Sequence, residues 1–202
     1  MGDAEASLRR TPVQRRSRQR VEALMAAAEG EFARVGFDGA GTTGIAARAG
    51  CSVGSLYQFF PHKGALLEAV VRRHGAELDR VAASALDAAG PGPAAVHRAL
   101  SEGVLDYASR APAVRALLCP TFASPVHAEA AAGLQQAMAR RLAAAFGGAG
   151  VDPDRCAAAA AVYVESLAGL LARAVDAEGG RDPVYGRELA AVLGAYADAL
   201  AR

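Results

Sequence analysis

The chain lacks most of the features by which enzymes and metal proteins are recognised in sequence. Its 202 residues include three cysteines and four histidines, no tryptophan, and only 5% aromatic side chains. The histidines have no metal-ligand spacing, and the cysteines fit neither a disulfide framework nor a zinc site. No phosphate-binding glycine loop, zinc-protease motif or nucleophile elbow is present. We therefore expect no enzymatic activity, no cofactor and no metal.

The cysteines are widely spaced and odd in number. We expect Cys51, Cys119 and Cys156 to be small buried hydrophobic residues, which is the usual behaviour of free cysteine. A redox-sensing pair of Cys119 and Cys156 is the alternative.

Long hydrophobic runs and strand-like alternation are missing as well. No run reaches the roughly 18 apolar residues of a membrane helix, and the N-terminus is acidic and then arginine-rich, without an apolar signal core. We expect a cytoplasmic protein with no membrane partner. Apolar residues still make up 52% of the chain, enough for one large domain or two small ones. The fold class that these patterns predict is all-α.

Lysine is almost absent, and the basic residues are unevenly distributed. Only Lys63 among the 22 basic residues is a lysine, a bias that we attribute to a GC-rich genome. Residues 1–63 carry nine basic and six acidic residues, net +3, whereas the remainder carries 13 and 15, net −2. The positive charge therefore accompanies the first third of the chain and favours an anionic partner there.

The most specific pattern lies in residues 42–63, TTGIAARAGCSVGSLYQFFPHK. Two short apolar stripes of helical spacing flank an interruption at Gly50. Gly50 stands where a tight turn needs a positive φ, and Leu56 stands where a side chain can fill the space between two helices. Ser52 is placed to cap the second helix. This spacing predicts a helix-turn-helix.

The non-core face of the second motif helix is small and polar, with two aromatic rings. Such a surface suits close approach to base edges and to the sugar-phosphate backbone. The residues on this face are Val53, Gly54, Ser55, Tyr57, Gln58 and Phe59.

The run that begins at Ile45, IAARAGCSVGSLYQFFPHKGALL, resembles the DNA-binding signature of the TetR family of bacterial repressors. The resemblance is close over about residues 15–80. The rest of the chain resembles the family only in its length and its all-helical character. It implies a homodimer whose recognition helices enter successive major grooves and whose C-terminal domain binds an inducer. Two positions depart from the family: Ala40-Gly41 replaces hydroxyl residues that open the first motif helix, and Phe59 replaces His or Tyr.

Motif, resemblance and charge together give the predicted DNA contacts. Arg15, Arg16 and Arg18 stand at a helix N-terminus, where cations oppose the helix dipole, so an anionic partner explains them better than helix stability does; solvated surface is the alternative. The predicted set is Arg15, Arg16, Arg18, Thr42, Thr43, Ser52, Val53, Gly54, Ser55, Tyr57, Gln58, Phe59 and Lys63.

We divide the chain into a flexible arm at residues 1–13, a DNA-binding domain at 14–62 and a ligand-binding and dimerisation domain at 63–202, with about nine helices. The arm is either a disordered terminus or a basic arm that touches DNA beside the main site. The helix that starts at Lys63 carries His74 on its apolar stripe, where a partnered core histidine is expected and a proton-sensing or ligand role is the lesser option. After Gly90-Pro93 come further helices, one of them short, at about 113–118.

The C-terminal helices supply two further predictions. A pocket for a mostly apolar effector should lie between the helices of residues 94–111, 126–146 and 152–178, and its expected lining is Tyr107, Phe122, His127, Met138, Tyr163, Glu165 and Ser166. The last two helices keep apolar residues on more than one face, which favours a four-helix interface with a second copy. The expected interface residues are Leu167, Leu170, Leu171, Leu189, Val192, Leu193 and Tyr196; close packing within one protomer is the alternative.

These observations favour a repressor that binds a palindromic double-stranded operator as a homodimer and is released by an unidentified small molecule. An activator or a ligand-independent DNA-binding protein would have the same residues, because the sign of regulation depends on where the operator sits. A carrier or helical enzyme with a vestigial helix-turn-helix is the third interpretation, which the basic residues around the motif disfavour.

Overall fold

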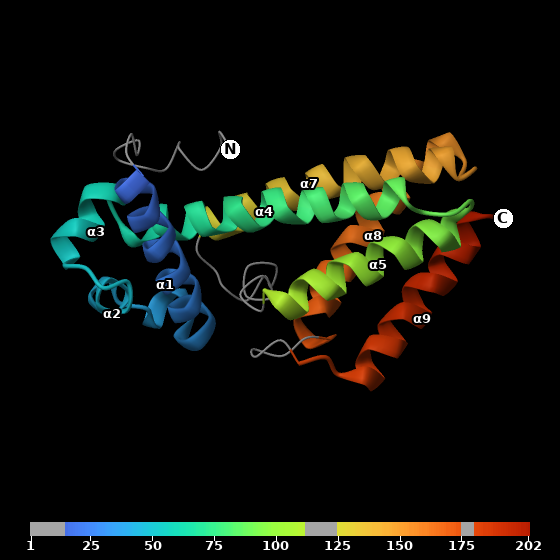
Figure 1. Ribbon diagram of the computed structural model, residues 1–202. Coiled ribbons are helices and arrows are strands. Elements are labelled where there is room, and N and C mark those ends of the chain that lie inside the picture. The colour runs from blue at the N-terminus through green and yellow to red at the C-terminus, as the bar shows by residue number, and fades with distance from the viewer. Residues whose placement is uncertain (1–14, 112–124, 175–179) are drawn as a thin grey trace. The chain divides into compact units, whose positions relative to one another are not determined.

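A computed structural model describes residues 15–111, 125–174 and 180–202, and every regular element in these ranges is a helix (Figure 1). The all-α prediction is confirmed. The helices are α1 (Arg15–Gly39), α2 (Thr42–Arg48), α3 (Val53–Phe59), α4 (Lys63–Asp87), α5 (Pro93–Arg110), α7 (Pro125–Gly148), α8 (Pro153–Ala174) and α9 (Pro183–Leu200). The N-terminal arm and the short helix expected near 113–118 lie outside the described residues. None of the described helices is long and apolar enough to cross a membrane.

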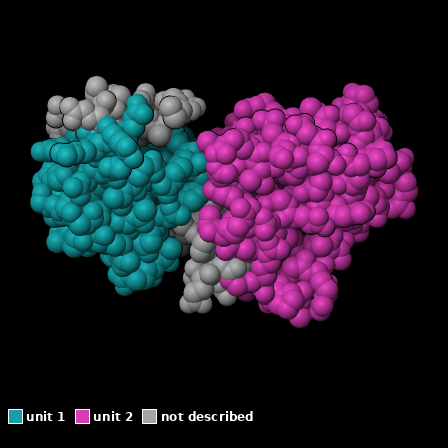
Figure 2. All heavy atoms as spheres, viewed as in Figure 1, with its two compact units in different colours: residues 1–74, 121–130 teal, residues 75–120, 131–202 magenta. Residues whose placement is uncertain are grey.

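The chain forms two compact units (Figure 2). Unit 1 comprises residues 1–74 and 121–130, and unit 2 comprises residues 75–120 and 131–202. The division falls inside α4, after His74, whereas the sequence placed the domain boundary before Lys63. The first half of α4 thus belongs with the helix-turn-helix.

Unit 1 is built from α1, α2, α3 and the first half of α4. Its apolar side chains converge from all four helices, and Leu24, Ile45, Leu56, Phe60 and Leu66 are completely buried. Leu56 fills the space between the two motif helices, as the spacing predicted.

A polar cluster fastens α4 to α1 within this unit. Glu29 on α1 forms an ion pair with Arg73. Its Oε1 also lies 2.9 Å from Nε2 of His74, which is buried. Burial raises the pKa of the Glu29 carboxyl, but the hydrogen bond and charge of His74 and the charge of Arg73 outweigh it and lower the pKa overall. His74 is therefore the partnered core histidine that the sequence predicted.

Unit 2 packs α5, α7, α8, α9 and the second half of α4 around one core. Within it, α5 and α9 approach closely at Gly194, where an added Cβ would lie 3.5 Å from Nε2 of His97. Further along α5, Gly103 faces Val81 of α4, with 3.3 Å between the position of such a Cβ and Cγ1 of the valine. Small residues therefore let α5 sit between two neighbours.

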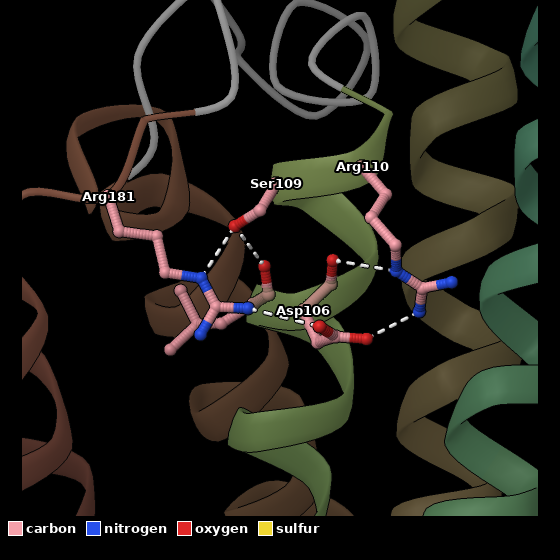
Figure 3. Close-up of polar contacts among 5 residues, drawn as sticks. Asp106, Ser109, Arg110 and Arg181 are labelled. Carbon is pink, nitrogen blue, oxygen red and sulfur yellow. Dashed lines mark hydrogen bonds and ion pairs between the residues drawn. The ribbon is translucent and has the colours of Figure 1, made fainter.

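The start of α9 is tied to the end of α5 by polar contacts (Figure 3). Arg181 donates from Nε to Oγ of Ser109 at 2.6 Å, and its guanidinium lies 3.4 Å from Oδ1 of Asp106. Asp106 also pairs with Arg110 on the same helix. One residue later, Asp182 caps α9 by accepting hydrogen bonds from the amides of residues 184 and 185. Together with Pro183 at the first helical position, this cap fixes the start of α9.

A buried polar cluster lies in the core of unit 2. The hydroxyl of Tyr163 on α8 lies 2.5 Å from Nδ1 of His97 and 2.7 Å from Oγ of Ser101, both on α5. Tyr163 is completely buried and packs edge-on against Phe146. Burial raises the pKa of Tyr163 far above its ordinary value, so the phenol stays protonated and can donate to His97.

His97 should make the stability of unit 2 sensitive to acid. Burial lowers the pKa of His97 below 6.5; the Ala190 carbonyl, Asp198 and Glu102 act in the raising direction and do not overcome it, and Arg98 adds to the lowering. His97 therefore binds a proton more readily in the unfolded chain than in the folded one. The contribution of neutral His97 to the stability of unit 2 is complete above about pH 6.5 and is lost as the pH falls through the folded-state pKa.

Urea unfolding at pH 7.5 and 5.5 measures this effect. We expect the wild-type protein to lose more unfolding free energy on acidification than His97→Gln, whose amide does not titrate. An equal loss in both proteins would assign the acid sensitivity to other groups.

Candidate nucleic-acid interface and ligand groove

The turn between α2 and α3 has the geometry that its residues predict. Gly50 adopts φ 65°, in the left-handed region that favours glycine. Ser52 caps α3, because its Oγ accepts a hydrogen bond from the Ser55 amide at 3.1 Å. Arg20 of α1 donates to the Gly50 carbonyl at 3.0 Å and so fastens the turn to the rest of unit 1. The start and direction of α3 are thereby fixed.

The predicted groove-facing side of α3 is open to solvent. Leu56 and Phe60 point into the core, whereas Gly54, Tyr57 and Gln58 are exposed. Ser52 is also exposed, and the remaining members of the predicted face are half-buried: Val53, Ser55 and Phe59. With 39% of its surface exposed, Tyr57 is one of the few large apolar side chains that the described residues leave open.

Tyr57 also links the two motif helices. Its hydroxyl lies 3.3 Å from Oγ1 of Thr42, the first residue of α2. Thr42 is half-buried and its neighbour Thr43 is exposed. Gly41 precedes α2 without a side-chain hydrogen bond, in agreement with the departure from the family pattern at this position.

A buried glutamate of α1, which the sequence analysis did not single out, contacts α2. Glu31 of α1 accepts hydrogen bonds from Arg34 at 2.7 Å and from Arg48 of α2 at 3.3 Å. The Arg34 hydrogen bond is the main reason that the pKa of Glu31 is lowered. A Cβ at Gly44 would lie 3.6 Å from Oε1 of Glu31, so α2 crosses close to this carboxylate. In the sequence, the one indication of this role is that Glu31 falls on the face of α1 that points into the core.

The predicted phosphate-contacting cations fall into two groups. Arg15, Arg16 and Arg18 are exposed, and they form no ion pair within the described part of the chain. Lys63 is different, because its ammonium lies 2.6 Å from the carbonyl oxygen of Phe37 and 3.0 Å from that of Ala40. The geometry therefore favours a structural contact for Lys63 over the phosphate contact predicted from the resemblance.

The described members of the predicted effector-binding set differ in exposure. Tyr107, Met138 and Tyr163 are buried in the core, Ser166 is half-buried and Glu165 is exposed. Phe122 and the side chain of His127 lie outside the described residues. The sequence missed His97 and Ser101 as the partners of Tyr163, because they are 66 and 62 residues away.

A half-open groove of about 170 Å³ lies between α7 and α8. Its walls are mainly alanine and valine, and its polar atoms come from Gln135, Gln136 and Glu165. Glu165 is the one member of the predicted lining set that it contains. The groove suits a small, mostly apolar group with one or two polar contacts.

The residues predicted for the dimer interface differ in exposure within the single chain. Four of the seven are buried within the single chain: Leu167, Leu171, Leu189 and Leu193. Leu170 and Tyr196 are half-buried. Val192 is 60% exposed and is accompanied by Val162 and Val184, at 50% and 58%. Among the described residues of α8 and α9, the exposed large apolar side chains are therefore these three valines, of which the prediction named Val192.

Two sequence profiles match the chain. That of bacterial regulatory proteins of the tetR family matches residues 24–70, and that of the Tetracyclin repressor-like C-terminal domain matches residues 92–196, more than half of the chain. The chain belongs to the TetR family. As a TetR-family transcriptional regulator, it carries its DNA-binding helix-turn-helix in unit 1, and the second profile covers most of unit 2. No curated protein matches it in sequence.

Solved structures share the fold of this TetR-family chain. A TetR-family transcriptional regulator from Streptomyces coelicolor is 19% identical, with a TM-score of 0.73, over 92% of this chain and 97% of that one. A transcriptional regulator from Rhodococcus sp. Rha1 is 23% identical, with a TM-score of 0.67, over 89% and 95%. One from Cytophaga hutchinsonii is 20% identical, with a TM-score of 0.64, over 90% and 96%.

Proposed function

We propose that the protein is a repressor that binds a near-palindromic DNA operator as a homodimer and is released by a small, mostly apolar effector. The observation that carries the proposal is the outer face of α3, which is capped, fixed on unit 1 and open to solvent over Gly54, Tyr57 and Gln58. Small side chains allow a helix to enter the major groove closely, and Tyr57 and Gln58 supply groups for base edges and backbone.

The exposed arginines would supply the sequence-independent part of DNA binding. Arg15, Arg16 and Arg18 are not neutralised by carboxylates among the described residues, so their charges are free for phosphates. Roughly six to eight phosphate contacts per dimer would lower the affinity about 10³- to 10⁵-fold between 50 and 200 mM salt.

The homodimer would form through the exposed face of α8 and α9. Val162, Val184 and Val192 are the exposed large apolar side chains among the described residues of unit 2. Small exposed residues accompany them, including Ala158, Gly169 and Ala191, so the helices of a second copy can approach closely. Pairing α8 and α9 with their symmetry mates buries this face in a four-helix interface.

Effector release follows from linkage. The groove between α7 and α8 would take the apolar body of the effector, with Gln135, Gln136 or Glu165 holding a polar group. The effector would favour an arrangement of the two DNA-binding units that differs from the DNA-bound one, and would therefore weaken operator binding. By reciprocity, the operator weakens effector binding by the same factor.

Selection from a random double-stranded DNA pool by the purified protein tests this function. We expect recovery of a near-palindrome whose half-sites are about one helical turn apart, which is the spacing of successive major grooves. Folded protein that enriches no sequence at low salt would contradict the proposal.

Tyr57→Ala should lower operator affinity about ten- to hundredfold, because it removes a side chain from the face of α3 that reads the groove. The salt dependence should not change, since tyrosine carries no charge. Fluorescence anisotropy with the selected operator measures both quantities. Tyr57→Phe is the matched control, because it loses only the hydroxyl that contacts Thr42.

If Tyr57 is instead a structural residue, Tyr57→Ala will lose helicity or dimer mass. If Tyr57 reads the groove, circular dichroism and sedimentation of Tyr57→Ala should match those of the wild-type protein.

A further inference from the structure

The ammonium of Lys63 is fully occupied within unit 1. Its Nζ lies 2.6, 3.0 and 3.4 Å from the carbonyl oxygens of Phe37, Ala40 and Asp38, respectively, and 4.4 Å from the centre of the Phe37 ring. An ammonium has three donors, so these carbonyls can take all of them. The contacts join the first turn of α4 to residues 37–40, here called the α1–α2 connection, which comprise the last residues of α1 and Ala40.

The carbonyls of Phe37 and Asp38 belong to the last residues of α1, after a break in the helix, and that of Ala40 follows the helix end. Gly36 has φ 73° and ψ 174°, which breaks the helical path inside the range of α1. Carbonyls at the end of a helix have no intrahelical donor, and a cation near them is favourable. Lys63 supplies that cation from 23 to 26 residues away in sequence.

The amino-acid usage of the chain points in the same direction. Lys63 is the single lysine among 22 basic residues. For a phosphate contact arginine serves as well or better, because its guanidinium fork matches phosphate geometry. Three carbonyls that converge on one point instead suit the compact ammonium better than the planar guanidinium fork. A chain that uses arginine everywhere else has lysine where this geometry requires it.

We propose that Lys63 is a positioning residue: it holds the α1–α2 connection on the first turn of α4 and so sets the placement of the helix-turn-helix, without itself binding phosphate. Ala40 lies two residues before the start of α2, and Tyr57 of α3 contacts Thr42 at that start. A shift of the first turn of α4 therefore moves the connection and, through α2, the outer face of α3. This inference rests on the proposed DNA-binding function.

Titration of the selected operator at several salt concentrations separates the roles. We expect both Lys63→Arg and Lys63→Met to lose affinity about tenfold or more, since each breaks hydrogen bonds to a charged donor. Both should keep the wild-type salt slope. Arg16→Gln is the comparison variant and should lower the slope by roughly 1.8 per dimer, about 0.9 for each lost phosphate contact.

Two results would overturn the proposal. Wild-type affinity in Lys63→Arg together with a reduced salt slope in Lys63→Met would make Lys63 a phosphate contact. Wild-type affinity in both variants, with only a lower melting temperature, would make it a merely structural residue.

A second measurement needs no DNA. Protein labelled with ¹⁵N-lysine gives a single side-chain ammonium signal, because Lys63 is the only lysine. We expect slow hydrogen exchange with water at neutral pH in the free wild-type protein, as for an ammonium held by three carbonyls. Rapid exchange would contradict the contact between Lys63 and the three carbonyls but not the proposed DNA-binding function. Failure of the wild-type protein to bind any sequence, with a slowly exchanging ammonium, would instead contradict the proposed function and the positioning role that rests on it.

Discussion

Val192→Glu is expected to give a folded monomer that binds its operator about 10²- to 10⁴-fold more weakly than the wild-type protein. Val192 is 60% exposed on α9, so a carboxylate there is solvated in the single chain and tolerated by its fold. In the proposed dimer the same carboxylate, repeated by symmetry, would be buried in an apolar interface without a partner. Loss of the dimer removes the gain from binding two half-sites at once.

Sedimentation velocity and operator titration measure the two effects, and Leu193→Glu is the matched comparison. Leu193 is the next residue and is only 2% exposed, so its replacement places an unpaired charge in the core of unit 2 and should unfold that unit. A dimer of unchanged mass in Val192→Glu would remove this face of α9 from the interface.

Tyr163→Ala is expected to be among the most destabilising single changes in unit 2, costing about 3–5 kcal/mol of unfolding free energy. The side chain is completely buried, and its removal leaves a cavity beside Phe146. It also leaves His97 and Ser101 without the hydroxyl that lies 2.5 and 2.7 Å from them. Urea unfolding followed by circular dichroism measures the loss.

Tyr163→Phe separates the ring from the hydroxyl. It keeps the apolar ring and should cost about 1–3 kcal/mol, the usual penalty for buried polar groups left unpaired. If Tyr163 lined the effector site, as the sequence suggested, Tyr163→Phe would instead alter the response to effector while leaving the unfolding free energy near the wild-type value.

The helix-turn-helix was predictable because its chemistry is local. Gly50 must reach a positive φ, Ser52 must cap α3 and Leu56 must fill a fixed gap, and all three requirements act within a few residues of one another. Such constraints leave a recognisable spacing in the sequence. The structure confirms each of these three predictions.

The dimer surface was less predictable, since periodicity alone does not say which side of an apolar helix faces the core. Leu189, Val192 and Leu193 all lie on the apolar stripe of α9, but only Val192 is exposed. In α9 the neighbour that decides the question is α5, whose His97 packs against Gly194. That contact joins residues almost 100 positions apart and leaves no local pattern.

Long-range polar contacts were missed for the same reason. The sequence placed Tyr163 at a ligand site, whereas its hydroxyl lies between His97 and Ser101 of α5. It assigned Lys63 to phosphate, whereas its ammonium contacts the carbonyls of Phe37, at the end of α1, and of Ala40, which follows it. In both cases the residue type was informative, but its partner became visible only with the tertiary structure.

The most direct test of the account is the ratio of affinities for the selected operator and for a scrambled duplex of equal length, measured at matched salt together with the stoichiometry of the complex. The account predicts two protomers on each palindrome and a preference of about 10³-fold or more, which is the range of specific DNA-binding proteins. Equal affinity for both duplexes, falling with salt in the same way, would show charge-driven binding alone and contradict the assignment of α3 as a base-reading helix.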